Sequence, residues 1–276
     1  MQSHLKERCC LKITGNDTIR FLQGLVTNDL SLLEKQKAIY ASLLSPQGKI
    51  LFDFIILKTT GGVMLDVACI SIPDLLKRFT LYKLRAEVLI EDVSEHYFII
   101  AGFGPETKPE DDLAYEDPRH PELGWRYFLN RKRPFPETVD PLEYHKHRIA
   151  LGVPEGGKDF PLGDTYPHEA LLDHLNGISF LKGCYIGQEV VSRMEHRAKP
   201  KRRIVSLIGT NTLHQDAPIH AGETLAGKMG SVSGTRGLAL LKSESIKKAH
   251  SKELKLSSED VPLHIEFSAW APFIPE

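Results

Sequence analysis

The pattern of the chain changes near residue 201, and this change constrains the fold more than any other feature of the sequence. Before this point, apolar runs suited to strands alternate with helical segments, and after it short strand-like runs are separated by turns that contain glycine. Strands interleaved with helices predict an α+β sandwich, whereas short strands between glycine turns predict a small β-barrel. We therefore expect two α+β domains and a barrel, over residues 1–103, 104–200 and 201–276.

Local signals place several elements before the barrel. The turn residues Ser45-Pro-Gln-Gly48 lie between two strand-like runs, residues 37–44 and 49–58, and predict a hairpin. Proline suits the first turn of a helix, where its missing backbone N–H would have no partner. Helices are therefore expected to begin at Pro73 and at Pro141.

Two further segments before residue 201 have weaker patterns. Residues 104–122 are rich in proline, aspartate and glutamate and hold few apolar residues, so we expect a loop or connection there. Residues 170–175 are expected to form a short helix ahead of the cysteine motif described below.

Composition excludes some classes of protein. The 276 residues carry a net charge of −1, so direct nucleic-acid binding is not expected from the overall charge. No apolar run is long enough to span a bilayer, and the N-terminal residues lack the patterns of a secretory signal or a transit peptide. The four cysteines form no Cys-x-x-Cys pair, which favours a reduced, cytoplasmic protein. The scattered histidines predict no metal site.

A reactive cysteine is suggested by the stretch Phe180-Leu-Lys-Gly-Cys-Tyr-Ile-Gly-Gln-Glu189. A thiol becomes a nucleophile or a metal ligand only as the thiolate, and nearby cations such as Lys182 favour that form. The glycines on either side of Cys184 allow a ligand to approach the backbone closely. The alternative is a small buried hydrophobic residue, which is what most free cysteines are, so both interpretations of Cys184 stay open.

The same motif resembles the signature of the YgfZ family, a branch of the glycine-cleavage T-protein superfamily. Three other patches, in the family's order along the chain, are similar to segments of that superfamily. They are residues 15–29, residues 148–154 and Pro167-His-Glu169, the last with Tyr166 in place of the usual leucine. The resemblance therefore runs over most of the chain.

This resemblance implies a fold and a function. The implied fold has ferredoxin-like α+β domains followed by a β-barrel, and the implied role is the assembly or repair of iron–sulfur clusters in client enzymes, including tRNA-modifying ones. Tetrahydrofolate, or another reduced folate, would bind in a central cavity between the domains. Cys184 would be the reactive or cluster-handling group at the mouth of that cavity, and Lys182 would favour its thiolate. The implied partners are folate and iron–sulfur assembly proteins or their client enzymes.

The chemistry of folate suggests which side chains would bind it. The pterin ring presents adjacent N–H donors that one carboxylate accepts, its flat face stacks on aromatic rings, and its glutamate tail suits cations. A surface or capping role is the alternative for each carboxylate, because carboxylates are mostly exposed. The candidate cofactor-binding residues are Asn28, Asp53, Arg148, Glu169, Tyr185, Gly187, Gln188, Glu189 and Arg193.

Two other functions remain open. One is a tetrahydrofolate-dependent aminomethyltransferase. True T-proteins carry a Gly-Gly-Ile-x-Asp-Asp-type strand, and here Lys49 replaces one glycine and Phe52 replaces one of the two acidic residues, while Asp53 is retained. The other is a non-catalytic interaction module for tRNA or protein, which the six cations of residues 193–203 favour and the net charge does not.

Overall fold

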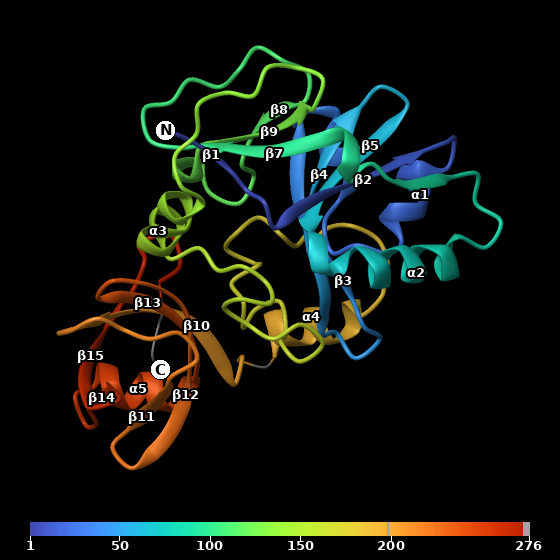
Figure 1. Cartoon of the computed structure of the whole chain (residues 1–276). Helices are drawn as coiled ribbons and strands as arrows, with labels where there is room; N and C mark the ends of the chain where they lie inside the picture. Colours follow the sequence, from blue (N-terminus) through green and yellow to red (C-terminus); the bar gives the residue numbers. More distant parts are fainter. Residues whose placement is uncertain (198, 273–276) are drawn as a thin grey trace. The chain divides into compact units, whose positions relative to one another are not determined.

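The computed structural model describes residues 1–197 and 199–272. The chain forms two compact units (Figure 1). The first unit comprises residues 1–47, 51–144 and 175–188, and the second comprises residues 48–50, 145–174 and the chain from residue 189 on.

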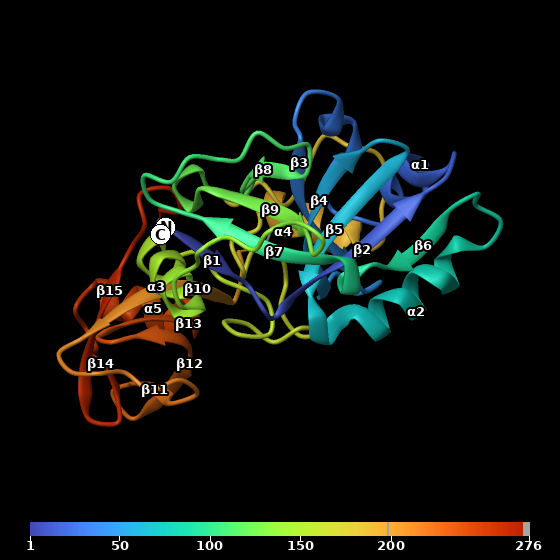
Figure 2. The ribbon, with the colours of Figure 1, turned by 45° about the horizontal axis from the view of Figure 1, so that its top comes forward.

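A five-stranded sheet with the order β3-β4-β5-β2-β6 forms the larger part of the first unit (Figure 2). Helices α1 and α2 pack against one face of this sheet, where Phe79 of α2 contacts both Phe21 of α1 and Phe54 of β4. Successive side chains of a strand point to opposite faces of the sheet, and those that face the helices are apolar and form the core. The bounds are β2 Arg8–Thr14, α1 Thr18–Gln23, β3 Ala38–Leu44, β4 Ile50–Thr59, β5 Gly62–Ala68, α2 Ile72–Lys83 and β6 Leu89–Asp92.

A four-stranded sheet with the order β1-β7-β9-β8 completes the first unit. Strand β8 lies inside residues 104–122, where a connection was predicted, and it pairs with β9 in antiparallel register. Strands β1 and β7 precede residue 103 and strands β8 and β9 follow it, so this sheet includes strands from both sides of the predicted domain boundary. The boundary itself stays a prediction. The bounds are β1 Gln2–His4, β7 Tyr97–Gly102, β8 Ala114–Glu116 and β9 Trp125–Asn130.

The second unit contains a closed barrel with the strand order β10-β13-β12-β11-β14-β15. Apolar residues from every strand fill its interior, and helix α5 adds Ile246 to that core. The α+β fold with a C-terminal barrel is therefore confirmed. The bounds are β10 Arg202–Gly209, β11 Pro218–Ala221, β12 Thr224–Ser233, β13 Arg236–Lys242, α5 Ser243–His250, β14 Leu256–Ser258 and β15 Val261–Glu266.

The structure contains the hairpin and two of the helices that the local sequence predicts, but not the predicted short helix before the cysteine motif. The hairpin around residues 45–48 and the helices at Pro73 and Pro141 are confirmed. The helix predicted over residues 170–175 is wrong: this segment is a series of turns, and Leu171 has a φ of +63°, which a helix does not allow. The other helices are α3 Pro141–Leu151 and α4 Gln188–His196, with short 3₁₀ turns at Leu30–Glu34, Cys69–Ser71, Ser94–His96 and Pro121–Leu123.

Within the described residues, none of the helices is both long and apolar enough to cross a membrane.

Candidate functional site

Cys184 lies on an exposed loop between residue 181 and the start of α4, and its thiol is free. The other described free cysteine, Cys10, is buried, and burial raises the pKa of its thiol. Gly187 ends the loop with a φ of +82°, a conformation that glycine adopts without strain. Cys184 is therefore the free thiol among the described residues that a partner molecule can reach.

Lys182 holds the base of this loop. Its ammonium group donates to the backbone carbonyls of Gln23 and Val26 at 2.7 Å and of Asn28 at 2.8 Å. These bonds use all three N–H donors of the ammonium group. Burial lowers the pKa of Lys182 to about 8. The structure thus shows Lys182 anchoring the loop to residues 23–28, and its predicted effect on the Cys184 thiolate stays a prediction.

Asn28 ties the segment before the motif to the five-stranded sheet. Its side-chain amide donates to the carbonyl of Tyr40 at 2.8 Å and to that of Asn176 at 2.7 Å, and its Oδ1 accepts from the Asp29 N–H. A buried amide with its hydrogen bonds made in this way is typical of a structural residue. Its predicted contact with folate stays a prediction.

The second half of the motif begins a helix. Tyr185 is buried, which raises the pKa of its phenol to about 12, and its carbonyl accepts from the Gln188 N–H. Glu189 and Arg193 extend from α4 with exposed side chains. An acidic residue in the first turn of a helix is favourable because of the helix dipole, so Glu189 also has a structural reason for its position.

Asp53 lies on the face of the five-stranded sheet that points away from the helices. Its Oδ2 accepts from the phenol of Tyr40 at 3.0 Å, and both residues are buried. Burial, reinforced by the charge of Asp53, raises the pKa of Tyr40 well above its usual value. The neighbouring Phe52 points to the opposite face and joins the apolar core beneath the helices.

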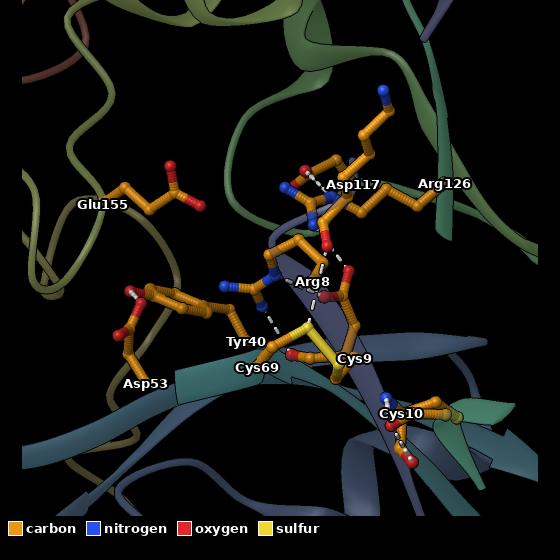
Figure 3. Close-up of polar contacts among 12 residues, drawn as sticks. Arg8, Cys9, Cys10, Tyr40, Asp53, Cys69, Asp117, Arg126 and Glu155 are labelled. Carbon is orange, nitrogen blue, oxygen red and sulfur yellow. Dashed lines mark hydrogen bonds and ion pairs between the residues drawn. A yellow bond between two sulfur atoms is a disulfide. The ribbon is translucent and has the colours of Figure 1, made fainter. Parts of the chain in front are cut away.

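A buried ion-pair cluster, which we define as Arg8, Asp66, Asp117, Arg119 and Arg126, joins the two sheets of the first unit (Figure 3). Arg8 donates to Asp66 Oδ1 at 2.6 Å, and Arg126 donates to Asp66 Oδ2 at 2.5 Å and to Asp117 at 3.0 Å. Arg119 binds Asp117 through two parallel hydrogen bonds. These paired bonds make the cluster geometrically specific.

The charges of this cluster stabilise one another. Burial alone would raise the pKa of the Asp66 carboxyl, but the guanidinium groups of Arg126 and Arg8 outweigh that effect and lower it. The pKa of Asp117 is held well below its usual range by Arg119 and Arg126, again against the effect of burial. Both carboxylates are therefore charged at neutral pH.

A disulfide joins Cys9 of β2 to Cys69, the residue that follows β5 (Figure 3). The sequence led us to expect that all four cysteines are reduced, and this disulfide contradicts that expectation for Cys9 and Cys69. Sequence spacing gave no sign of the bond, because 60 residues separate the two cysteines and only the pairing of β2 with β5 brings them together.

In the second unit, Arg148 and Glu169 each belong to a separate buried network. Arg148 donates to Asp159 at 2.7 Å and to the Ser231 hydroxyl at 2.6 Å. Both oxygens of Glu169 accept from the guanidinium group of Arg202, and one also accepts from the Tyr166 N–H. Two of the six cations between residues 193 and 203, Arg202 and Arg203, belong to strand β10.

Two family models match separate parts of this chain. The family described as "GCVT N-terminal domain" matches residues 3–109, and "CAF17, C-terminal beta-barrel domain" matches residues 201–273. The protein named "Iron-sulfur cluster assembly factor IBA57, mitochondrial" from Mus musculus is 34% identical over 88% of this chain and 78% of its own length. The human protein of the same name is 32% identical with the same coverage.

The chain belongs to the IBA57 family.

One further relative and one solved structure are also similar to this chain. The IBA57 homolog from Mycosarcoma maydis is 34% identical over 72% of this chain, and the chain spans only 55% of that relative. The solved aminomethyltransferase T of the glycine cleavage system from Bartonella henselae superposes with a TM-score of 0.78, covering 98% of this chain and 86% of its own. At 15% identity this likeness shows the fold alone.

The T-protein superfamily suggested by the sequence motifs is thus supported, and the finer assignment to its YgfZ branch is not confirmed. The IBA57 relatives are named as mitochondrial proteins. The cytoplasmic location expected for this chain stays a prediction.

Proposed function

We propose that this protein acts in iron–sulfur cluster assembly and that the Cys184 thiolate contacts the cluster. Two observations support the proposal: the IBA57 relatives are named as cluster assembly factors, and Cys184 is an exposed free thiol on an anchored loop. Thiolates are the usual ligands of iron in such clusters. The cluster is the cargo of the reaction and not a resident group of the chain.

A single cysteine cannot hold a cluster alone. Iron–sulfur clusters are usually held by about four thiolates, so the remaining ligands would come from a partner protein. In this arrangement Lys182 fixes one end of the loop to residues 23–28, and the start of α4 fixes the other. Fixing both ends limits the freedom that Cys184 would lose on binding.

A substitution at Cys184 tests the role of the thiol. Cys184→Ser should abolish the recovery of iron–sulfur enzyme activity in cells that lack the native protein, while Ser192→Ala, a change to an exposed residue of α4, should leave it intact. The melting temperature of both variants should stay within a few degrees of the parent because exposed side chains contribute little to stability. Full recovery with Cys184→Ser would refute the proposal.

We also propose that the protein binds a reduced folate through Asp53. This carboxylate is buried and accepts from the Tyr40 phenol, and a carboxylate is the group that accepts the adjacent N–H donors of a pterin ring. Bound folate would supply a carrier of one-carbon units.

Calorimetric titration tests the folate proposal directly. Tetrahydrofolate should bind the parent protein at one site, and Asp53→Asn should weaken binding, whereas Asp74→Asn on the surface of α2 should not. Absence of heat and of any thermal shift at millimolar tetrahydrofolate would refute it. The result is independent of the Cys184 experiment, so the two proposals can fail separately.

A further inference from the structure

A pocket opens in the wall of the barrel where strand β14 ends and its neighbour β15 continues. The two strands pair from Leu256 and Leu263 to the turn between them, and β15 then runs on through residues 264–266. Beside this part of β15 lie the end of α5 and residues 251–255, which connect α5 to β14 (Figure 1). The pocket lies wholly within the second unit and measures about 430 Å³, a volume in the range of small-molecule sites.

The floor of this pocket is apolar. Leu256 and Leu263 line it and are buried in the barrel core, and Ile265 and Phe267 line it as partly buried residues packed against that core. The ring of Phe267 meets the imidazole of His250 edge to face at 5.5 Å. An apolar group placed on this floor would leave water, which is favourable.

The rim of the pocket is basic. Lys252, Lys255, His250 and His264 line it with exposed side chains, and the lining residues include neither aspartate nor glutamate. Across the part of the chain that the structure describes, the two lysine ammonium groups make neither a hydrogen bond nor an ion pair. An ammonium group carries three N–H donors, so both lysines can bind an anion without giving up an existing partner.

The carboxylates nearest to the pocket in sequence do not neutralise these lysines. Glu253 accepts from the hydroxyl of Ser251 at 2.8 Å, and Glu266 forms an ion pair with Arg236. Glu223, on the turn between β11 and β12, does not line the pocket, and it pairs with no cation in the described chain. The rim therefore keeps an excess of positive charge.

The end of α5 fixes the segment that carries the two lysines. The N–H of Lys252 donates to the carbonyl of Ala249, and that of Leu254 donates to the carbonyl of Lys248. Lys252 adopts a φ of +63°, the left-handed conformation in which many helices end. These bonds occupy carbonyls of the last helical turn, whose partial negative charge disfavours a nearby anion. They also order the segment before a ligand arrives, which lowers the entropic cost of binding.

We propose that this pocket binds a small organic anion with an apolar body, of the class of medium-chain carboxylates. The carboxylate lies at the rim, near Lys252 and Lys255, and accepts from an imidazole N–H of His264. The apolar chain lies on the floor of the pocket, so each part of the ligand meets the part of the site that suits it. None of these residues takes part in the roles proposed for Cys184 and Asp53, so this site can be tested independently of them.

Ligands that share one chain but differ in their head group test the charge of the site. Octanoate should bind the full chain at one site in a calorimetric titration, and octylammonium should bind at least roughly 5-fold more weakly because its charge matches that of the rim. Hexanoate, which is two methylenes shorter, should bind roughly 10-fold more weakly than octanoate because it buries less apolar surface. Absence of octanoate binding at millimolar concentration, or equal binding of octanoate and octylammonium, would overturn the proposal.

Charge reversal tests the two lysines. Lys252→Glu and Lys255→Glu should each weaken octanoate roughly 2- to 5-fold and should strengthen octylammonium. Both side chains are exposed, so neither variant should lose its fold. Lys77→Glu, the same change on the exposed face of α2, should leave both ligands unaffected. Unchanged affinities in both pocket variants would contradict the role of the lysines.

Backbone amide signals in the NMR spectra of labelled protein locate the ligand. Octanoate should shift the signals of Lys255, Leu256 and His264 and leave that of Lys77 unchanged. Shifts confined to other residues would place octanoate elsewhere and overturn the proposal.

Vesicles of phosphatidylglycerol distinguish a free carboxylate from a lipid surface, because their anionic head groups offer similar chemistry on a membrane. The parent protein should stay in the supernatant when these vesicles are sedimented. Sedimentation with the vesicles that Lys252→Glu abolishes would assign the site to a lipid surface and overturn the proposal.

Discussion

Arg126 and Asp66 form an ion pair at 2.5 Å that connects the two sheets of the first unit, and both side chains are almost completely shielded from water. Arg126 comes from β9 and Asp66 from β5, so the pair bridges elements 60 residues apart in sequence. Each charge is held by more than one partner, because Asp66 also binds Arg8 and Arg126 also binds Asp117. The contact is therefore a network and not an isolated bond.

Removing one charge from this network should destabilise the protein strongly. Asp66→Asn would leave Arg8 and Arg126 with one counter-ion fewer in a buried place, and breaking a buried pair in this way costs about 3–5 kcal/mol. Urea unfolding measures this loss, with Asp74→Asn on the surface of α2 as the control. An equal free energy of unfolding for Asp66→Asn and the parent would show that the network contributes nothing to stability.

The same network predicts instability in acid. The pKa values of Asp66 and Asp117 are lower in the folded state than in the unfolded chain, where an aspartate has a pKa of about 3.9. The unfolded state therefore binds more protons in acid, and the stabilisation, which is fully present above about pH 4, is lost as the pH falls through the folded pKa values. Unfolding measured from neutral pH down to acid should show this loss, and Asp66→Asn should show less of it.

The disulfide between Cys9 and Cys69 should contribute to stability as a cross-link. It closes a long loop in the unfolded chain, and such bonds typically contribute about 2–4 kcal/mol. Cys9→Ser combined with Cys69→Ser should lower the melting temperature in the absence of reductant and should make it insensitive to added reductant. A parent protein whose intact mass shows four free thiols would contradict the bond itself.

Local sequence signals predicted the elements that depend only on local chemistry. Pro73 and Pro141 mark helix starts because proline suits a first turn wherever the helix lies. Strand β8 escaped prediction because its three residues are defined by pairing with β9, which composition does not reveal. The turns over residues 170–175 escaped it because the positive φ of Leu171 is imposed by the surrounding fold.

In the candidate site, too, the sequence predicted what depends on local chemistry and missed what depends on contacts between distant residues. The motif predicted an exposed, reachable thiol as one of two interpretations of Cys184, and the structure places it on an exposed loop. Sequence reasoning paired Lys182 with that thiol because the two are neighbours in the chain, whereas its ammonium group binds carbonyls more than 150 residues away. The buried ion-pair cluster was missed because a charged residue in a strand gives no sign of the sheet that will cover it.

The pKa of Lys182 predicts a rise in stability with alkaline pH. It is lowered to about 8 by burial, whereas an unfolded lysine has a pKa of about 10.4. Between these values the unfolded state binds more protons than the folded state, so the free energy of unfolding increases with pH over that window. Subtracting the unfolding curve of Lys182→Met from that of the parent isolates this contribution; a difference that falls with pH over the window would contradict the prediction.

The side chains of Phe52 and Asp53 point to opposite faces of the five-stranded sheet. The sequence comparison suggests that Phe52→Asp restores a lost acidic residue, but Phe52 belongs to the apolar core and faces away from Asp53. A carboxylate there would be buried without a partner, so Phe52→Asp should destabilise the first unit by several kcal/mol or prevent folding. Phe52→Leu, which keeps the site apolar, should cost much less. Neither variant should release ammonia from an aminomethyl-loaded carrier protein with tetrahydrofolate; transfer by a folded Phe52→Asp protein would show that this position does reach the carboxylate side of the sheet.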